Sequence, residues 1–336
     1  MAGRKLNRQQ RWRVERIQQE RIARAEKRGL IADDLLVQGS LGQELQGRVL
    51  AHFGTQLDIE ALDQSQTQRC YVRSNLQGLV TGDEVIWQPS LDASTPGVIS
   101  ALLPRRTLLE RPDAYGQRKP VAANISQLVI VLAAQPEPSA RLIDHYLVAA
   151  HAAGLLPLLV LNKEDLLREP QRELLQTYED LGYRRITTQA LSGELGTLPD
   201  ELKGHVSAFV GQSGVGKSSL INALLPGTVQ AVQELSDRSG LGQHTTTTAR
   251  LFHFPGGGDL IDSPGIREFG LGLLTPTEIL QGFIEIRPLL GSCRFRNCRH
   301  LQEPGCALKL AVSEGRLHAS RLQSLLTMLT TTEANS

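Results

Sequence analysis

The spacing of apolar and polar residues changes along the chain. Between residues 46 and 104, short runs rich in β-forming residues are separated by Gly, Asn, Asp, Ser and Pro. This pattern predicts short strands at 47–54, 57–63, 69–75, 83–89 and 97–104. Several short strands at this spacing favour a small antiparallel barrel like the oligonucleotide-binding (OB) barrel, although strand content alone fits an SH3-like barrel as well.

From about residue 125 the pattern alternates between strands and helices. The run at 127–134 is apolar throughout, as expected for a strand buried on both faces. Further strands are expected at 155–161, 183–189, 205–210, 249–254 and 258–262, and helices at 139–154, 170–182 and 216–225. Such alternation predicts a parallel sheet flanked by helices. Beyond about residue 275 the chain is predicted to be helical, interrupted by a cluster of Cys and His.

The charge of the chain is uneven. The 336 residues, enough for two or three domains, carry a formal net charge of +1. Residues 1–29 contain ten Lys and Arg against three Glu, a charge of +7, which leaves −6 for the remainder. A basic tail of this kind indicates a polyanionic partner or, as the simpler alternative, a solvated basic helix.

The sequence contains no apolar run of the ~18 residues that a membrane span needs. No apolar segment follows the basic N-terminus, as one would in a signal peptide. We therefore expect a cytoplasmic protein without a membrane partner, whose four cysteines stay reduced.

Residues 211–218 fit the phosphate-binding pattern G-x-x-x-x-G-K-[ST] at every position. Its glycines let backbone N–H groups converge on phosphate oxygens, Lys217 would reach the β- and γ-phosphates, and the Ser218 hydroxyl would bind Mg²⁺. An expected strand before the loop and an expected helix after it disfavour a merely structural glycine-rich turn. The residues expected at GTP are Gly211, Gln212, Ser213, Gly214, Val215, Gly216, Lys217, Ser218 and Ser219.

A second motif ends an apolar strand and consists of Asn162, Lys163, Glu164 and Asp165. The Asp165 carboxylate can accept hydrogen bonds from the ring N–H and the exocyclic amine of guanine, and adenine offers neither donor in that arrangement. Two such bonds, of roughly 1.5–3 kcal/mol each, would discriminate between the bases by about a hundredfold or more. The loop that usually completes a guanine pocket is expected at Thr188-Gln189, in place of the usual Ser-Ala.

A third motif closes the strand expected at 258–262 and consists of Asp262, Ser263, Pro264 and Gly265. Asp262, 45 residues after Lys217, would hold the magnesium shell, and the Gly265 N–H would contact the γ-phosphate. Four threonines lie between these motifs, at 245–248, and any of them could complete the coordination of Mg²⁺. We expect Thr246 and Thr247 to do so.

The base motif precedes the phosphate loop, whereas in ordinary GTPases it follows. The order is a cyclic permutation that keeps the neighbours within each half. Because the ligand of a doubly wound sheet lies at the carboxyl ends of the strands, the loops can meet in space whatever the chain order. The permutation also places the segment after Asp262–Gly265 directly before the C-terminal region, so a signal from the γ-phosphate could pass to that region.

Four potential metal ligands lie close together in the C-terminal region, and they are Cys293, Cys298, His300 and Cys306. Three thiolates and one imidazole form a closed set suited to one structural, tetrahedral Zn²⁺. The alternative is a group of reduced core cysteines with an unrelated histidine. Arg294, Arg296 and Arg299 lie in the same segment and could contact phosphates.

Taken together, the barrel, the permuted motifs "GQSGVGKSSLIN", "HTTT" and "DSPGIREFG", and the Cys/His cluster resemble the small ribosomal subunit-dependent GTPase A family. The resemblance covers residues from about 40 to 325. It implies a GTP hydrolase that binds the small ribosomal subunit, acts in its late maturation and is stimulated by it. It also implies that the barrel and the zinc module bind ribosomal RNA.

The expected organisation is multidomain: an OB-like barrel, a circularly permuted α/β P-loop GTPase domain and a C-terminal helical zinc-binding module. The expected boundaries are 1–38 for the basic tail, 39–104 for the barrel, 105–274 for the GTPase domain and 275–336 for the zinc module. We expect a monomer that uses one structural Zn²⁺, and Mg²⁺ together with GTP.

The residue that positions the hydrolytic water is not the usual one. Many GTPases place a Gln after Asp-x-x-Gly for this task, but Ile266 follows here. His244, just before the threonines, is the candidate, placed when the subunit binds, and a purely structural histidine is the alternative. Ser213 stands where some potassium-activated GTPases have Asn, so no potassium dependence is predicted.

Two other functions fit parts of the sequence. Ile266 leaves open an RNA-binding scaffold in which GTP is only a conformational ligand, and GTP turnover with and without small subunits would separate the two. An ATP-using P-loop enzyme is disfavoured by Asn162–Asp165. The sequence does not indicate which RNA helices are contacted, at which assembly stage, or whether the basic tail becomes ordered on binding.

Overall fold

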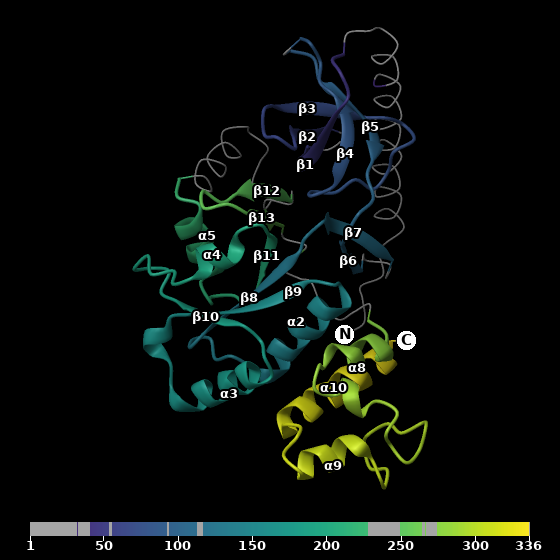
Figure 1. The fold of residues 1–336 in the computed structure, drawn as a ribbon, viewed down its shortest axis with the longest axis vertical. Helices are drawn as coiled ribbons and strands as arrows, with labels where there is room; N and C mark the ends of the chain where they lie inside the picture. The colour runs from purple at the N-terminus through teal and green to yellow at the C-terminus, as the bar shows by residue number, and fades with distance from the viewer. Residues whose placement is uncertain are drawn as a thin grey trace, which may run out of the picture. The chain divides into compact units, whose positions relative to one another are not determined.

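The computed structural model describes Ala32, Ile266 and residues 41–53, 56–92, 94–112, 117–227, 249–263 and 274–335. The chain divides into two compact units between Arg105 and Arg106 (Figure 1). Apart from Ala32, the basic tail predicted at 1–38 lies outside the described residues. Within the described ranges, no helix combines the length and the apolar character that crossing a membrane requires.

The first unit contains a closed barrel of five strands. They are β1 (Leu45–Phe53), β2 (Gln56–Ala61), β3 (Thr67–Val72), β4 (Glu84–Gln88) and β5 (Gly97–Leu102). The strand order is β1-β2-β3-β5-β4, and pairing of β1 with β4 closes the barrel. The five predicted strands and the small barrel are therefore confirmed. One pair differs from the antiparallel prediction: β3 and β5 run parallel, because β4 separates them in the chain but lies on the far side of β5 in space.

Buried and partly exposed residues alternate along β2, and this alternation shows how the sequence forms the barrel. Leu57 and Ile59 are buried, whereas Asp58 and Glu60 are partly exposed. Successive side chains of a strand point to opposite faces, so one face of β2 is apolar and the other polar. Leu57 and Ile59 belong to the barrel core together with Trp87, which is fully buried.

A two-stranded antiparallel sheet, β6 (Leu108–Pro112) and β7 (Arg118–Ala123), begins the second unit. The sequence pattern did not predict these strands. Each contains a proline, Pro112 or Pro120, and proline weakens the strand signal because it cannot donate a ladder hydrogen bond.

Within the described residues, the main sheet of the second unit has six strands. They are β8 (Gln127–Ala133), β9 (Leu156–Asn162), β10 (Arg185–Thr188), β11 (Val206–Val210), β12 (Arg250–His253) and β13 (Asp259–Asp262). Their order is β10-β9-β8-β11-β13-β12. All neighbours are parallel except β12 and β13, which are antiparallel. The prediction of a parallel sheet therefore holds for the other strands and is wrong for β12, because a short turn rather than a crossover helix joins it to β13.

Helices accompany this sheet as the strand–helix alternation predicted, although the helix at Leu198–Leu202 was not predicted. They are α2 (Ala140–Ala152), α3 (Glu169–Asp180), α4 (Leu198–Leu202) and α5 (Lys217–Leu224). α4 and α5 share a hydrophobic core with Val129 and Val131 of β8, and α2 contacts β8 and β9. All seven residues of β8 are buried, which explains its continuous apolar run.

Three helices follow in the C-terminal region, α8 (Pro276–Gly282), α9 (Ala307–Ser313) and α10 (Ala319–Asn335). They belong to the same compact unit as the sheet, and both α8 and α10 pack on α2. Val148 of α2 lies in one hydrophobic core with Ile279, Phe283 and Leu325. Helix α2 is therefore shared between the sheet and the C-terminal helices.

A buried arginine lies where α10 meets α2. Arg321, which is 1% exposed, donates to both carboxylate oxygens of Glu285, at 2.6 and 3.0 Å, and to the carboxylate of Asp144. Asp144 also accepts a hydrogen bond of 2.6 Å from the Tyr178 hydroxyl on α3. Breaking a buried pair by removing one partner leaves an uncompensated charge, so this group ties α10 firmly to α2 and α3.

Candidate functional site

The predicted phosphate loop joins β11 to α5 at the carboxyl edge of the sheet. Gly211 has a φ of 140°, and a Cβ at this residue would lie 2.2 Å from the Val131 carbonyl oxygen on β8. Only glycine therefore lets the loop leave the sheet so close to the neighbouring strand. Lys217 folds back over the loop, because its Nζ donates to the carbonyl oxygens of Gly211 at 2.7 Å and Gln212 at 2.6 Å.

The loop offers an exposed surface suited to an anion. Ser213, Gly214 and Ser218 are exposed, whereas Val215 anchors the loop in the core. Helix α5 begins at Lys217, and the backbone N–H groups at a helix N-terminus attract negative charge. Together with the Lys217 ammonium, these groups can bind a phosphate.

Asn162, buried at the end of β9, connects three segments of the site. Its Nδ2 donates to the Val215 carbonyl at 3.0 Å. Its Oδ1 accepts from the Ala190 N–H at 3.0 Å and from the Thr188 hydroxyl at 3.3 Å. Gly216 gives this amide room, because a Cβ there would lie 2.2 Å from Asn162 Nδ2. One side chain therefore holds the base motif, the phosphate loop and the loop after β10 together.

Lys163 adopts a left-handed backbone conformation, with φ of 61° and ψ of 45°, where the chain leaves β9. Its Nζ donates to the carbonyl oxygens of Gly214 at 2.8 Å and Gln135 at 3.1 Å. The following residues form the short 3-10 helix Glu164–Leu166, in which Asp165 is exposed. A base can therefore reach Asp165 from solvent, two residues beyond the contact with the phosphate loop.

Two residues that take part in this arrangement escaped the sequence patterns. Gln135 contributes its carbonyl oxygen and Ala190 its backbone N–H. No particular side chain is needed for either contact, so no pattern of residue types marks them. Gln189, expected beside Thr188, donates its backbone N–H to the Glu194 carbonyl at 2.7 Å.

The residues expected around Mg²⁺ and the γ-phosphate are only partly described. Asp262 ends β13 and is half-buried, and Ser218 lies in the first turn of α5. Ile266 is 2% exposed, so an apolar, buried side chain occupies the position where many GTPases have Gln. The predicted residues that lie outside the described ones are His244, Thr246, Thr247 and Gly265.

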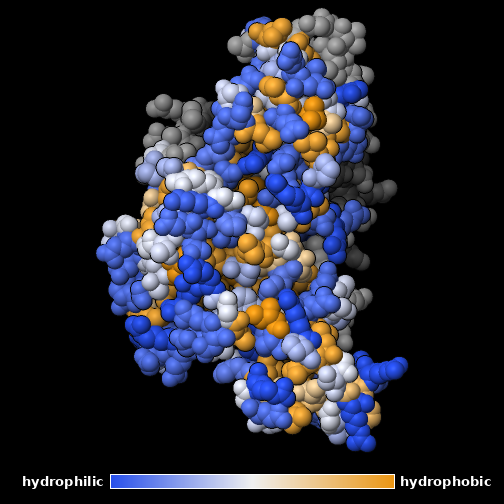
Figure 2. All heavy atoms as spheres, viewed as in Figure 1, coloured by the Kyte–Doolittle hydropathy of each residue, from blue (hydrophilic) through white to orange (hydrophobic). Residues whose placement is uncertain are grey.

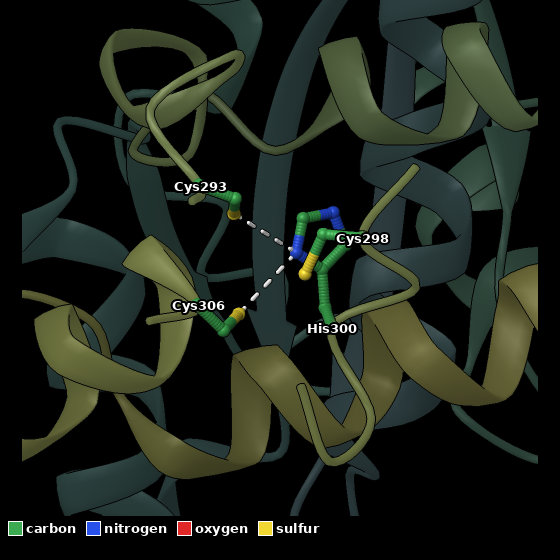
Figure 3. Close-up of side chains that lie close together, drawn as sticks. All are labelled: Cys293, Cys298, His300 and Cys306. Atoms are coloured by element: carbon green, nitrogen blue, oxygen red, sulfur yellow. Dashed lines mark hydrogen bonds between the residues drawn. The ribbon is translucent and has the colours of Figure 1, made fainter. Parts of the chain in front are cut away.

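The four potential metal ligands converge in the C-terminal region (Figure 3). The ligand atoms of Cys293, Cys298, His300 and Cys306 all lie within 4.8 Å of one another. His300 Nδ1 is 3.6 Å from Cys293 Sγ and 3.4 Å from Cys306 Sγ. This cluster could hold one metal ion.

The pKa values of His300 and Cys298 bear on how readily the cluster can bind a metal cation. Burial lowers the pKa of His300, which favours the neutral imidazole that a metal requires. Burial, with a contribution from the adjacent sulfurs of Cys293 and Cys306, raises the pKa of the Cys298 thiol to about 11. A bound cation must displace thiol protons, so the affinity for metal is expected to rise with pH.

Glu303 holds the loop that carries His300. Its carboxylate accepts hydrogen bonds from the N–H groups of Arg299 at 3.0 Å, Leu301 at 2.9 Å and Gln302 at 3.1 Å. These bonds lower the pKa of Glu303, and they surround a left-handed backbone at His300, whose φ is 63°. A short surface segment is thereby held in the shape that directs the imidazole at the sulfurs.

The surface around the cluster is basic and carries an exposed aromatic ring. Arg294, Arg296 and Arg299 are exposed, and Phe295 is 42% exposed. The Arg294 guanidinium lies 5.6 Å from the centroid of the Phe295 ring. Figure 2 shows hydrophilic and hydrophobic residues side by side on the surface of the C-terminal helical region.

The order of these elements along the chain defines a class of protein. The strands that carry the base motif and its companion loop, β9 and β10, precede β11 and the phosphate loop, although all three lie in one sheet. Asn162 joins the Asn-Lys-x-Asp motif to the phosphate loop. The protein is therefore a circularly permuted P-loop GTPase.

Comparison with known proteins identifies the family. A protein-family model of the RsgA GTPase matches residues 102–272. The small ribosomal subunit biogenesis GTPase RsgA of Pseudomonas aeruginosa (strain UCBPP-PA14) is 56% identical over 329 residues, 96% of each chain. The protein of the same name from Azotobacter vinelandii (strain DJ / ATCC BAA-1303) is 56% identical over 332 residues, again 96% of each chain. The chain belongs to the RsgA GTPase family and is a GTP-hydrolysing enzyme.

Two solved structures share the fold. YjeQ from Thermotoga maritima superposes with a TM-score of 0.70 at 32% identity, over 87% of this chain and 99% of that one. YloQ, described as a circularly permuted GTPase, gives a TM-score of 0.70 at 27% identity, over 88% of this chain and 96% of that one. The predicted fold class, a barrel followed by a permuted GTPase domain and a C-terminal region with a Cys/His cluster, is confirmed.

Proposed function

We propose that this enzyme binds the small ribosomal subunit and hydrolyses GTP to GDP and phosphate in late maturation of the subunit, with stimulation by the subunit. The observation that carries the proposal is the 56% identity, over 96% of the chain, to a protein named for small ribosomal subunit biogenesis. The contacts of Asn162 with the phosphate loop and with the segment Thr188–Ala190 support a site for the whole guanine nucleotide.

In the proposed complex the two ends of GTP are held by different loops. The phosphates lie on residues 211–219, where Lys217 contacts the β- and γ-phosphates. Asp165 accepts hydrogen bonds from guanine, and Thr188 supports this pocket through Asn162. The exposure of Asp165 and Ser213 supports this assignment, since both are accessible to a ligand.

Mg²⁺ is proposed to lie between Ser218, the last residue of the phosphate-binding pattern, and Asp262, the last residue of β13. Thr246 and Thr247 would complete its coordination, and Gly265 would contact the γ-phosphate. Mg²⁺ prefers oxygen ligands and keeps several waters, so a hydroxyl and a carboxylate suit it. Because Ile266 is buried and aliphatic, the attacking water needs another residue, for which we propose His244.

The metal of the Cys/His cluster is proposed to be one structural Zn²⁺. A tetrahedral ion with Zn–S distances of ~2.3 Å and Zn–N distances of ~2.0–2.1 Å places sulfur and nitrogen ligands about 3.5 Å apart. The separations of 3.6 and 3.4 Å from His300 Nδ1 to Cys293 and Cys306 fit this geometry. Four protein ligands leave no open position, which is typical of structural sites.

We propose that the exposed surface around this cluster binds ribosomal RNA. Arginine suits phosphate oxygens, and an exposed ring such as Phe295 offers a stacking surface for an unpaired base. The barrel segment 41–105 has a different charge, with seven Asp and Glu against four Arg. Because the barrel segment is not basic overall, we propose that only a small part of it contacts RNA. The +7 tail adds a general electrostatic attraction to a polyanion.

Three further expectations belong to this proposal. We propose that the protein acts as a monomer in the cytoplasm, and that the basic tail, the barrel, the GTPase domain and the zinc module occupy 1–38, 39–104, 105–274 and 275–336. The division of the chain between Arg105 and Arg106 supports the boundary after the barrel.

GTP turnover with and without purified small subunits tests the proposal. Subunits are expected to raise kcat of the full-length protein, and absence of any increase would contradict the role of the subunit. The His244→Ala variant is expected to keep its GTP affinity and to lose roughly a hundredfold of the stimulated rate, since a positioned proton acceptor contributes about that much. An unchanged stimulated rate in this variant would contradict the role of His244 and leave the role of the subunit standing.

A further inference from the structure

The base motif is attached to the protein on both sides of Asp165. On the N-terminal side, Asn162 and Lys163 bind the phosphate loop and its neighbours. On the C-terminal side, the chain passes through the 3-10 helix Glu164–Leu166 and enters α3 at Glu169. Asp165 itself is exposed, so the position of its carboxylate depends on how these two ends are held.

Gln171 holds the C-terminal end. It lies in the first turn of α3 and is 7% exposed. Its Nε2 donates to the Ala134 carbonyl at 3.1 Å, and its Oε1 accepts from the Arg168 N–H at 3.0 Å. One buried amide therefore joins the segment after Asp165 to the end of β8.

The N-terminal end is attached to the same place. Lys163 Nζ donates to the carbonyl oxygen of Gln135, the residue next to Ala134. Two adjacent carbonyl groups at the end of β8 thus receive one side chain from each side of Asp165. Because β8 is buried along its whole length, it is a rigid reference for this segment.

We propose that Gln171 is a positioning residue for guanine recognition: it sets the place of the Asp165 carboxylate by holding the start of α3 against the end of β8. The inference rests on the proposed contact between Asp165 and guanine. It adds a residue that lies outside the Asn-Lys-x-Asp motif and whose carboxamide bonds to backbone groups at both ends.

The chemistry of this position favours glutamine. A carboxamide donates through its nitrogen and accepts through its oxygen, and both roles are used here. An ionised Glu at 171 would have no donor for the Ala134 carbonyl, and Asn would be one methylene shorter. The simpler alternative is that Gln171 only caps α3 and stabilises the helix.

Affinities for GTP and for inosine triphosphate distinguish a residue that positions Asp165 from one that only caps α3. Inosine triphosphate lacks the exocyclic amine, so the ratio of the two affinities reports one of the hydrogen bonds that Asp165 would accept. In Gln171→Ala, GTP affinity is expected to fall about tenfold and this ratio about fivefold, since Asp165 would no longer be held in place. A helix cap alone would lower both affinities equally.

Gln176 provides a matched control on the same helix. Its Nε2 donates to Asp180 at 2.9 Å on the exposed side of α3. Gln176→Ala removes the same type of side chain and a hydrogen bond, and it should leave both affinities unchanged. Should Gln171→Ala not fold, Gln171→Asn keeps the amide and is expected to lower the ratio by a smaller factor in the same direction.

A double-variant cycle completes the test. In an Asp165→Ala background, Gln171→Ala is expected to leave the ratio of GTP to inosine triphosphate affinity unchanged, because the group that it positions is gone. Equal loss of both affinities in Gln171→Ala, or a further fall of the ratio without Asp165, would overturn the inference. If the wild-type protein bound both nucleotides equally, the proposed contact of Asp165 would itself be wrong, and the inference would fall with it.

Discussion

In the nucleotide site, the groups that surround Asn162 and Lys163 come from three other segments of the chain, between Gln135 and Val215. The candidate metal ligands all lie between Cys293 and Cys306. In the nucleotide site, side chains donate to backbone carbonyls at the edge of a buried sheet. Around the metal cluster, the chain between Leu289 and Ala307 forms neither helix nor strand, and the ligand side chains converge on one another.

This difference teaches how each site is stabilised. The sheet and its hydrogen bonds shape the nucleotide site without needing the ligand. The metal segment has no sheet around it, and a bound cation would join its four ligand side chains to one another. We therefore expect the nucleotide site to be rigid in the free protein and the metal segment to depend on its ion.

Removal of the metal should have the largest effect. A chelator, or the variant Cys306→Ser, is expected to unfold the segment 290–316, because binding of Zn²⁺ to small metal modules is worth about 10–16 kcal/mol. Hydrogen exchange of these amides and the metal content measure this effect, while GTP affinity should stay within about threefold.

Cys70 provides the control for this prediction, since it is buried in the barrel core and is no part of the cluster. Cys70→Ala should keep one equivalent of metal. If Cys306→Ser lost GTP binding together with the metal, the two sites would not be independent, and the comparison would be wrong.

The second-largest effect is expected at Arg321, between α2 and the C-terminal helices. Arg321→Met leaves Asp144 and Glu285 buried without their cation, and it should lower the free energy of unfolding by about 3–5 kcal/mol. Chemical denaturation measures this loss. Arg316→Ala, which removes an exposed ion pair with Glu314, should cost less than about 1 kcal/mol. Equal costs for the two variants would show that the buried group does not tie the helices together.

A smaller effect, confined to the nucleotide site, is expected for Gly216→Ala. The added Cβ would lie 2.2 Å from Asn162 Nδ2 at a φ of 97°, so it displaces the amide that joins three loops. Loss of these hydrogen bonds and the backbone strain should weaken GTP binding by on the order of a hundredfold, with the metal content unchanged. Titration with GTP measures the change.

The variant Gly182→Ala is a control for Gly216→Ala, because it introduces backbone strain without a steric clash. Gly182 has a φ of 88°, but a Cβ there would meet nothing within 4 Å. Gly182→Ala should therefore cost about 1 kcal/mol of stability and leave GTP affinity unchanged. GTP affinity of Gly216→Ala within about threefold of the wild-type value would show that Asn162 is not the junction of the site.

Much of the fold could be predicted from the spacing of apolar residues. A strand buried on one face has apolar residues at every second position, and a strand buried on both faces is apolar throughout. The strands of the barrel and β8 could be predicted for this reason. The direction of β12 and the parallel pair β3–β5 were not found. Strand direction depends on how the connections cross in space, and the apolar pattern carries no record of it.

The sequence by itself determined the chemistry of the protein, because the phosphate loop, the Asn-Lys-x-Asp motif and the Cys/His spacing each require particular side chains at particular distances along the chain. Only the tertiary structure decided which backbone groups meet these side chains. The carbonyls of Gln135 and Val215 and the N–H of Ala190 have their roles through position alone. Backbone groups are the same in every residue, so their part in a site appears only when the chain is folded.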